Sequence, residues 1–349
     1  MEPFEIGGRP VGPGEPTFVI AEAGSNHNGD FETAKDLIDV AVEAGADAVK
    51  FQTFRAEDLY VEDSGEVEYL DDDRSIYDII ESMEMPHEWV PKLHDYCREQ
   101  EIYFLSTPFD ERSAEVLSEY VPAWKVASYT SSHHPFLREL AASEKPIIMS
   151  TGAHDLAEVR ESVEVLQNTG VSGLALLQCV AAYPTPLEDS NVKVVETLAD
   201  EFGVPAGLSD HTLDPVTAPA AAVALGASVV EKHFTLDKTM EGPDHEFALE
   251  PDELTEMVTA VRNTEAALGT SKKYVLDVES ELHDKARRAV HAVDDISAGE
   301  EFTPENIKVL RPGEQQAGFH PKFYDELLGE TAARDIQKST GIQWEDVNR

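Results

Sequence analysis

Eight short apolar segments, most of them ending in polar residues, alternate with stretches of helical periodicity over the first 268 residues. Parallel strands need a crossover connection, so this alternation predicts a parallel sheet. Eight such units in about 250 residues predict a (β/α)8 TIM barrel, in which all strands end at one mouth. The predicted strands are Phe18–Glu22, Ala48–Gln52, Ile102–Thr107, Ala123–Ser128, Pro146–Thr151, Gly173–Cys179, Val204–His211 and Ser228–His233.

Capping residues and apolar spacing place helices between these strands. Asp30 and Asp155 are each suited to cap a helix, and Pro215 suits a first helical turn. An insert of residues 55–100, between the second and third strands, has room for two helices and a loop over the mouth. The other expected helices of the barrel, which begins near residue 16, span residues 30–44, 155–167, 215–225 and 251–268.

The sequence changes character after residue 268. Residues 269–284 are polar and lack strong periodicity, which is typical of a linker. Short apolar runs separated by turns follow, and they predict a small β-rich domain over residues 285–349. We therefore expect a barrel domain of residues 1–268, a linker and a compact C-terminal domain.

The chain is strongly acidic. It contains 69 Asp and Glu residues against 27 Lys and Arg residues, which gives a formal net charge of −42 in 349 residues. A hydrophobic content of 41% argues against a disordered acidic protein. The acidic residues are spread along the chain, with the densest patch at residues 66–73. This composition is typical of a folded protein from a halophile, and it disfavours nucleic acid and anionic membranes as partners.

Other features of the sequence point to the cytoplasm. Cys97 and Cys179 are too few and too far apart to form a disulfide framework. The first residues have neither the basic start nor the apolar core of a signal peptide. No apolar run approaches the length of a membrane span.

Two histidines, His211 and His233, end the seventh and eighth predicted strands. Neighbouring strands lie about 4.8 Å apart, so both imidazoles can reach one ion. Asp210 and Asp244 are nearby candidates for oxygen ligands. Mixed imidazole and oxygen ligands suit Mn, Fe, Co or Zn.

Three lysines, Lys50, Lys125 and Lys232, lie within predicted strands. A lysine that faces the barrel interior must bind an anion, pair with an internal carboxylate such as Glu22 or Glu231, or lose its proton. Lys232 is the weakest candidate for anion binding, because its neighbours along the strand compete for the single inward face. The hydroxyl groups at strand ends that suit phosphate or carboxylate oxygens belong to Thr107, Ser128 and Ser209.

Two loops at the mouth carry further polar groups. The segment Gly24–Gly29 holds two asparagines and a histidine, which favours contact with a sugar or phosphate over a plain tight turn. It matches neither a Walker nor a dinucleotide-binding motif. Tyr183, in the rigid loop after the sixth strand, either lines a sugar pocket or packs against its neighbours.

Taken together, these segments resemble the sialic acid synthase family (N-acetylneuraminate synthase and its relatives, including legionaminate and pseudaminate synthases). The C-terminal matches Arg287–Arg288, Asp295–Glu300 and Leu310–Gly313 are similar to the SAF (antifreeze-like) domain of that family. The matching stretches of the barrel are Ile20–Gly29, Val49–Gln52, Ser106–Asp110, Lys125–Ser128, Ser150–Gly152, Tyr183–Pro186, Gly207–Thr212, Val230–Asp237 and Gly242–Asp244.

The resemblance implies condensation of phosphoenolpyruvate with an N-acetylated amino sugar, giving a nonulosonic acid and phosphate. It implies a divalent metal on His211 and His233, typically Mn²⁺, with Mg²⁺ or Co²⁺ as alternatives. It also implies that Arg311 reaches the site of a partner subunit in a domain-swapped homodimer. The residues that match phosphoenolpyruvate-binding positions are Lys50, Thr107, Lys125, Ser128 and Ser209, and those that match positions around the sugar and the reacting carbons are Glu22, Gln52, Tyr183 and Asp244.

Two departures from the family pattern leave the acceptor sugar open. Thr130 stands where the family usually has an acid, and Ala181 stands where it usually has a polar side chain. N-acetylmannosamine and the 6-deoxy diacetamido sugars are both candidate acceptors. A Schiff-base aldolase using Lys125 or Lys50, and a non-catalytic sugar-binding protein, are the alternative functions.

Overall fold

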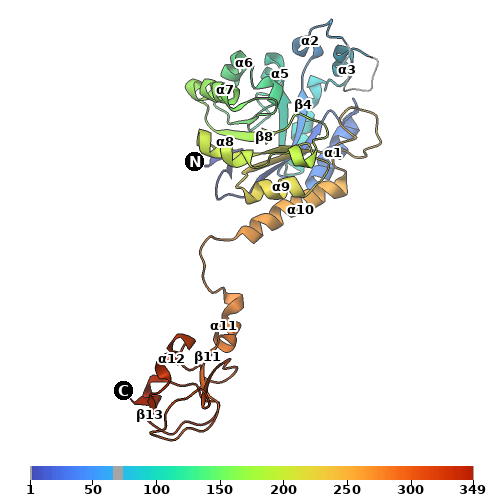
Figure 1. The fold of residues 1–349 in the computed structure, drawn as a ribbon. Coiled ribbons are helices and arrows are strands. Elements are labelled where there is room, and N and C mark those ends of the chain that lie inside the picture. The colour runs from blue at the N-terminus through green and yellow to red at the C-terminus, as the bar shows by residue number, and fades with distance from the viewer. Residues whose placement is uncertain (1, 66–73, 349) are drawn as a thin grey trace. The chain divides into compact units, whose positions relative to one another are not determined.

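The computed structural model describes residues 2–65 and 74–348, in two units, Met1–Gly269 and Thr270–Arg349 (Figure 1). The acidic patch at residues 66–73, and with it part of the loop expected over the mouth, lies outside the described residues. The two units are described separately below.

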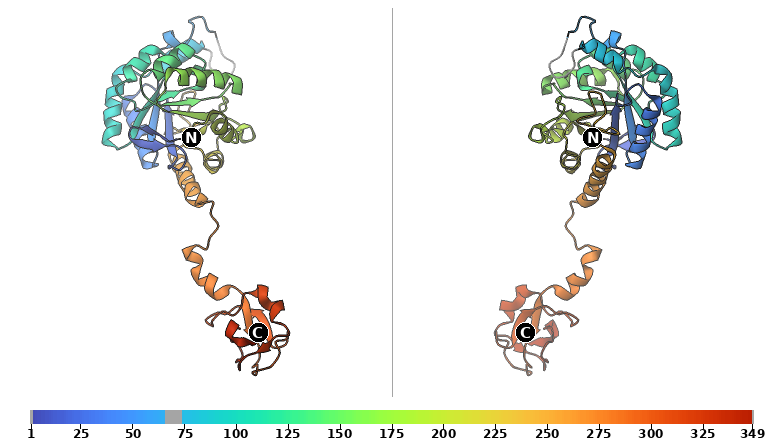
Figure 2. Two further views of the ribbon diagram at one scale, coloured as in Figure 1. Left: turned by 90° about the vertical axis from the view of Figure 1, so that its left-hand side faces the viewer. Right: turned by 90° about the vertical axis from the view of Figure 1, so that its right-hand side faces the viewer.

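The first unit is the predicted TIM barrel. Its eight parallel strands pair in the order β5-β4-β3-β10-β9-β8-β7-β6, and β5 and β6, at the two ends of this order, contact each other. Figure 2 shows the chain from two further sides. The expected fold class is thus confirmed. The strands are β3 (Phe18–Gly24), β4 (Ala48–Thr53), β5 (Tyr103–Pro108), β6 (Trp124–Val126), β7 (Ile147–Ser150), β8 (Leu174–Cys179), β9 (Ala206–Asp210) and β10 (Val229–His233).

Side chains alternate between the two faces of the barrel wall, as the two-residue period of a strand requires. In β3, Phe18 and Ile20 join the inner core, whereas Val19 and Ala21 pack with the surrounding helices. Glu22 continues the inward series at the mouth. This alternation decides which of the polar residues at strand ends can share a site.

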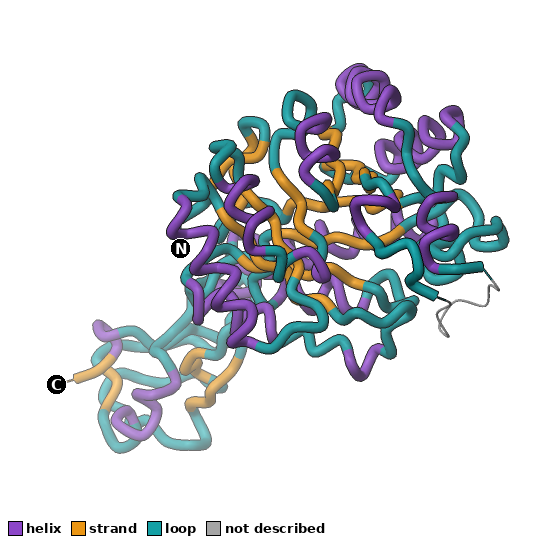
Figure 3. The backbone as a smooth tube through the Cα atoms, turned by 90° about the horizontal axis from the view of Figure 1, so that it is seen from above, coloured by secondary structure: helices purple, strands orange, loops and turns teal. Residues whose placement is uncertain are grey.

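The helices surround the strands, as seen from above in Figure 3. Asp30 and Asp155 cap α1 and α7 through their side chains, as predicted. The helix expected from Pro215 begins two residues later, because the Asp214 carboxylate accepts from the backbone amides of Val216 and Thr217 and turns the chain there. The helices after the strands are α1 (Phe31–Glu43), α4 (Val90–Glu99), α5 (Glu111–Leu117), α6 (His134–Ala141), α7 (Leu156–Thr169), α8 (Val194–Phe202), α9 (Thr217–Ala224) and α10 (Pro251–Leu268).

The insert after β4 contains more than the two predicted helices. It holds α2 (Ala56–Leu59), α3 (Ile76–Ser82) and a 3-10 turn (His87–Trp89) before α4. Helix α4 belongs to the barrel itself, since Val90, Leu93 and Cys97 pack into its outer core.

A hairpin that we did not predict precedes the barrel. Strands β1 (Phe4–Ile6) and β2 (Arg9–Val11) are antiparallel, and Ile6 and Val11 pack into the inner core. Gly7 and Gly8 turn the chain with φ of +58° and +89°, which is the geometry of a tight hairpin. The Gly7-Gly8 pair is therefore the feature of the sequence that indicates the hairpin.

The second unit has the expected compact, β-rich character. Its core contains Val290, Phe302, Ile307, Ile336 and Ile342. One helix, α11 (Ser280–Ala286), lies mostly within the segment expected to be a linker, because its residues favour helix and Lys285 pairs with Glu281 one turn earlier. The other elements are β11 (Ala289–Ala292), β12 (Ile307–Leu310), α12 (Tyr324–Leu327), β13 (Thr331–Ala332) and β14 (Val347–Asn348).

Across residues 2–65 and 74–348, no helix combines the length and apolarity needed to cross a lipid bilayer.

The net charge of −42 leads to our first prediction, that folding and activity require high salt. Screening shortens the reach of charge repulsion from about 10 Å at 0.1 M salt to about 3 Å at 1 M. Circular dichroism and activity measured from about 0.1 to 3 M KCl should both rise with salt over this range. A flat response of both would contradict the halophilic interpretation.

Candidate active site

The mouth of the barrel gathers most of the residues singled out by sequence. Glu22, Lys50, Lys125 and Ser209 lie at inward positions near the C-terminal ends of β3, β4, β6 and β9, and all four are buried. Thr107 occupies the matching position on β5. Arg311 belongs to the second unit, where it follows β12 and is exposed.

Two lysines and two glutamates alternate across the mouth. Lys50 Nζ lies 2.6 Å from Glu22 Oε2 and 3.8 Å from Glu231 Oε2. Lys125 Nζ lies 3.2 Å from Glu231 Oε1. Glu231 therefore links the two lysines, and each ammonium group faces a carboxylate in a buried setting where an unpaired charge would be costly.

Hydroxyl groups complete this network. Lys50 donates to Thr107 Oγ1 at 3.0 Å, and Ser209 donates to Glu231 Oε1 at 3.0 Å. Lys125 donates to Ser150 Oγ at 2.9 Å, a contact that our sequence analysis missed. Ser128 lies beside this group on the loop after β6, and its Oγ accepts from the backbone amide of Gly152 at 2.9 Å.

Burial and ion pairing shift the pKa values of these charged groups in opposite directions. Burial raises the pKa of Glu22 to about 7, against the lowering effect of Lys50. Burial also tends to raise the pKa of Glu231, but Lys125 and Lys50 outweigh it and lower that pKa. Burial lowers the pKa of Lys125, and Glu231 is the main group opposing this shift. Lys125 thus depends on Glu231 to stay protonated.

His211 and His233 lie together at the ends of β9 and β10, with ring centroids 5.5 Å apart. His211 Nδ1 lies 2.8 Å from the carbonyl of Val180, which can only accept, so this nitrogen carries a proton. Burial lowers the pKa of this ring, but contacts with Cys179 and Val180 outweigh it and raise the pKa. His233 is half-buried, desolvation lowers its pKa well below the ordinary value, and its Nδ1 is buried with no hydrogen-bond partner within the described part of the chain. His233 therefore offers a neutral imidazole, whereas His211 offers its Nε2 as a ligand only in its neutral form.

Aromatic rings enclose the histidine pair. The Tyr183 ring lies 4.2 Å from that of His211, centroid to centroid, and 5.2 Å from that of Phe247. The Phe247 ring, which sequence reasoning missed, lies 5.1 Å from that of His233. Within residues 2–65 and 74–348, no group of three or more His, Cys, Asp or Glu side chains is placed to hold a metal ion, so His211 and His233 stand as a pair.

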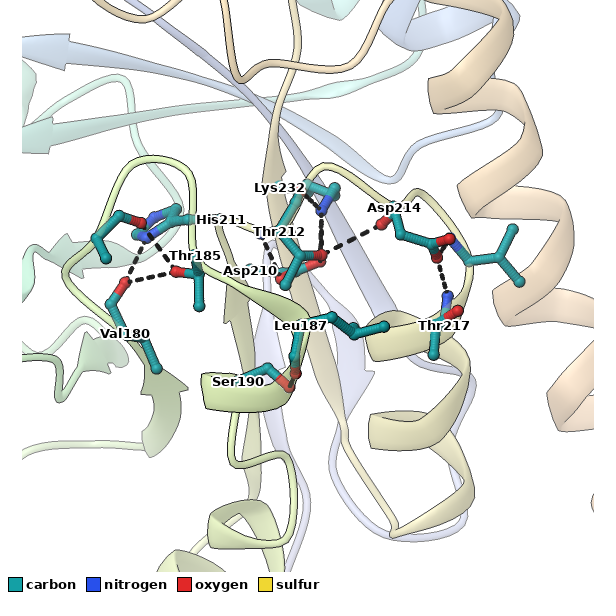
Figure 4. A network of polar contacts seen from close by, with 12 residues as sticks. Val180, Thr185, Leu187, Ser190, Asp210, His211, Thr212, Asp214, Thr217 and Lys232 are labelled. Carbon is teal, nitrogen blue, oxygen red and sulfur yellow. Dashed lines mark hydrogen bonds and ion pairs between the residues drawn. The ribbon is translucent and has the colours of Figure 1, made fainter.

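The structure corrects our suggestion that Asp210 is an oxygen ligand. Asp210 sits on the outward face of β9, where its carboxylate accepts from Lys232 Nζ at 2.5 Å and from Thr212 Oγ1 at 3.0 Å (Figure 4). The alternation that turns His211 inward turns Asp210 away. The same ion pair occupies the ammonium group of Lys232, so neither Asp210 nor Lys232 faces the mouth.

Gln52, Glu22 and Asp244 converge around one point. Gln52 Nε2 donates to Glu22 Oε1 at 2.9 Å. A Cβ atom on Gly24 would lie 3.3 Å from Asp244 Oδ2, 3.5 Å from Gln52 Nε2 and 3.7 Å from Glu22 Oε1. Burial raises the pKa of Asp244 to about 6, so this carboxyl and that of Glu22 titrate close to neutral pH.

Gly24 should be essential for this arrangement. Its φ of +55° disfavours any side chain, and a methyl group would press on Asp244 Oδ2 while touching the other two converging polar atoms. We expect Gly24→Ala to lower kcat/KM about 100-fold, since a small misplacement of reacting groups has effects of that size. Gly29→Ala is the matched control, because Gly29 has a φ of +70° in the same loop but open space around it. Equal losses in both variants would contradict the prediction.

The side chains of the polar loop Gly24–Gly29 make contacts within the barrel domain. Asn26 donates to the carbonyl of Phe234 at 2.8 Å, and Asn28 donates to that of Glu241 at 2.9 Å. His27 is buried against the rings of Trp89 and Phe51. These three side chains fix the loop in place, and its contact with a sugar or phosphate stays a prediction.

Comparison with known proteins agrees with this geometry. The NeuB family model matches residues 37–273, and the SAF domain model matches residues 287–348. The spore coat polysaccharide biosynthesis protein SpsE of Bacillus subtilis is 44% identical over 99% of this chain and 98% of its own, and its crystal structure superposes with a TM-score of 0.68.

Two further relatives carry activities in their names. A pseudaminic acid synthase of Campylobacter jejuni is 39% identical over 94% of this chain and 96% of its own. The crystal structure of an N-acetylneuraminic acid synthetase from Leptospira borgpetersenii, in complex with citrate, is 32% identical, covers 80% of this chain and 94% of its own, and has a TM-score of 0.72. The chain therefore belongs to the NeuB family and is an enzyme of the sialic acid synthase type, with a barrel followed by a SAF domain.

Proposed function

We propose that this enzyme condenses phosphoenolpyruvate with an N-acetylated amino sugar, N-acetylmannosamine or a 6-deoxy diacetamido sugar, to give a nonulosonic acid and phosphate. The observation that carries the proposal is the buried network of Lys50, Lys125, Glu22 and Glu231 beside the pair of His211 and His233, all at the mouth of one barrel. The network supplies cations for an anionic substrate, and the histidines supply imidazole nitrogens.

Phosphoenolpyruvate would bind at the two lysines. Lys50 and Lys125 offer charge-assisted hydrogen bonds to its phosphate and carboxylate oxygens, and Thr107, Ser128 and Ser209 offer hydroxyl groups around them. These groups are held by one another before substrate arrives, so little reorganisation is needed. The local cations would also admit an anion into a protein of net charge −42.

The sugar aldehyde would meet the enol carbon near Glu22, Gln52 and Asp244. In the reaction, C3 of phosphoenolpyruvate forms a bond to the aldehyde carbon, and the aldehyde oxygen takes up a proton. Water then adds to C2, and phosphate leaves with the bridging oxygen. Glu22, whose pKa is about 7, is suited to position the water and accept its proton.

His211 and His233 fit a divalent metal. Val180 orients the ring of His211 as carbonyl groups orient metal-binding imidazoles elsewhere, and His233 presents a buried nitrogen without a partner within the described residues. Mn²⁺ is the first expectation, with Mg²⁺ or Co²⁺ as alternatives. Such an ion would supply Lewis-acid polarisation of the sugar carbonyl.

A Schiff-base aldolase is the competing mechanism, because burial lowers the pKa of Lys125. However, Lys125 faces Glu231 at 3.2 Å, which favours the protonated and therefore non-nucleophilic amine. Phosphate release from phosphoenolpyruvate, measured with a panel of acetamido sugars at molar salt with Mn²⁺, tests the proposal. Sugar-dependent release supports it, whereas covalent trapping of pyruvate by borohydride without phosphate release would favour the aldolase.

We also propose that the enzyme works as a domain-swapped homodimer in which Arg311 completes the partner's site. Its planar guanidinium suits a carboxylate or sugar, and Pro312 stiffens the segment that carries it. Mixing Arg311→Ala subunits with His233→Ala subunits should restore activity on subunit exchange, because one mixed site receives an intact barrel and an intact tail. Full activity of Arg311→Ala alone would exclude this role.

A further inference from the structure

His245 follows Asp244 in the loop after β10, and the activity proposed above gives it no role. Its side chain is 1% exposed, so bulk water cannot replace the hydrogen bonds of its ring. The neighbouring loop, after β3, carries Asn28. Asn28 and Asp244 both line a cavity of about 220 Å³, whose third wall is the end of α3. The two loops therefore enclose the space beside Asp244.

Both ring nitrogens of His245 have partners, and the partners lie on different segments. Nε2 lies 3.2 Å from Asn28 Oδ1, and Nδ1 lies 2.6 Å from Thr235 Oγ1. The amide of Asn28 has a fixed orientation, because its Nδ2 donates to the carbonyl of Glu241 at 2.9 Å and its oxygen is left toward His245. That oxygen can only accept, so Nε2 of His245 carries a proton and donates it.

These contacts hold the chain on both sides of Asp244. Asn28 binds the carbonyl of Glu241 before it and the ring of His245 after it. Thr235, just past the end of β10, is fully buried, so its contact with Nδ1 also ties the ring to the barrel. Asp244 therefore lies between two points that are both fixed to the loop after β3.

The packing around Gly242 shows how closely the two loops fit. A Cβ atom on Gly242 would lie 2.8 Å from Cδ2 and 3.0 Å from Nε2 of His245, and 3.2 Å from Asn28 Oδ1. The φ of Gly242, +147°, is also one that residues with side chains rarely adopt. The glycine backbone thus packs directly against the hydrogen bond between His245 and Asn28.

We propose that His245 is a positioning residue, which acts through Asn28 to set the Asp244 carboxylate beside the reacting carbons. The inference rests on the proposed function, which brings the sugar aldehyde to Asp244. Oδ2 of Asp244 lies around the same point near Gly24 as polar atoms of Glu22 and Gln52. A shift of this loop would separate Asp244 from the other two groups, whereas the lysines on β4 and β6 would keep their places. Loss of the contact should therefore slow the reaction without weakening the binding of phosphoenolpyruvate.

The test replaces His245 by phenylalanine, which fills the space of the ring but cannot donate to Asn28. We expect kcat to fall about 10- to 100-fold, as a small misplacement of reacting groups requires, with the KM for phosphoenolpyruvate unchanged. His245→Gln, whose amide can still donate to Asn28, should recover most of the lost kcat. A merely structural role would not give this rescue, because glutamine fills a buried aromatic site less well than phenylalanine.

A second variant, Asn28→Gly, removes the other partner without disturbing a buried position. Asn28 is exposed and has a φ of +49°, which glycine adopts readily. This variant should reproduce the loss of kcat, and the double variant with His245→Phe should lose little more, because both changes break one contact. Asn191→Gly is the matched control and should keep the wild-type kcat, since Asn191 is also exposed, with a φ of +46°, in the segment before α8.

Sugar-dependent phosphate release by the wild type separates this inference from the proposed function. With that release observed, wild-type kcat in His245→Phe and Asn28→Gly would overturn the inference. Losses that add in the double variant, an equal loss in Asn191→Gly, or no rescue by His245→Gln would overturn it as well. If no acetamido sugar promotes phosphate release by the wild type, the proposed function itself is contradicted, and the inference falls with it.

Discussion

Replacing His233 by alanine is expected to lower turnover about 1000-fold or more while the barrel stays folded. Lewis-acid stabilisation of several kcal/mol would be lost, and each 1.4 kcal/mol corresponds to about a factor of ten. His233 contributes little to the core beyond its contacts with neighbouring rings, so circular dichroism at high salt should be unchanged. The measurement pairs phosphate release with the Mn²⁺ content of the purified protein.

Two controls separate a metal role from a structural one. Chelation should inactivate the wild type, and added Mn²⁺ should restore it but should not restore His233→Ala. The double variant His211→Ala/His233→Ala should be no worse than either single variant, because residues that act as a unit are not additive. If the wild type kept its full activity after exhaustive chelation, a catalytic role for the metal would be excluded.

Glu231→Gln is expected to raise the KM for phosphoenolpyruvate about 10- to 100-fold, which corresponds to loss of one charge-assisted contact. Glu231 is the carboxylate nearest Lys125, at 3.2 Å, whereas Lys50 retains Glu22 at 2.6 Å. Without Glu231, burial would drive Lys125 to its neutral form. The KM therefore reports the protonation of a single lysine.

The pH dependence of the KM shows in which direction the defect of Glu231→Gln should change. A lysine whose pKa is lowered carries its proton below that pKa and loses it above. The defect of Glu231→Gln should therefore shrink as the pH falls and grow as the pH rises. Ser209→Ala is the comparison variant: it removes a hydroxyl from the phosphoenolpyruvate site and a hydrogen bond to Glu231 but leaves the charge in place, so any rise in its KM should not vary with pH as that of Glu231→Gln does. A KM that stays at the wild-type value across pH would contradict the assigned role.

The barrel and most of its mouth were predictable because strand patterns and strand ends are local in sequence. Polar residues at strand ends lie on one rim in any parallel barrel, so Lys50, Lys125, His211 and His233 could be placed without coordinates. The N-terminal hairpin was missed because its strands have three residues each, too few for a periodic signal.

Other features depend on contacts between distant strands. Glu231 was considered only as a pairing partner, and its position between Lys50 and Lys125 follows from three strands meeting across the barrel. Asp210 seemed as well placed as His211, and only the alternation of faces separates them. The cavity beside α3 could not be foreseen, since it depends on how the insert folds onto two loops.

The central claim is that this mouth joins the enol carbon of phosphoenolpyruvate to a sugar aldehyde. The direct measurement is 13C NMR of a reaction with phosphoenolpyruvate labelled at C3, an acetamido sugar and Mn²⁺ at molar salt. The account predicts that the label becomes a methylene carbon bonded to the former aldehyde carbon, with one phosphate released for each bond formed. Label recovered as the methyl group of pyruvate, with phosphate released whether or not the sugar is present, would contradict it.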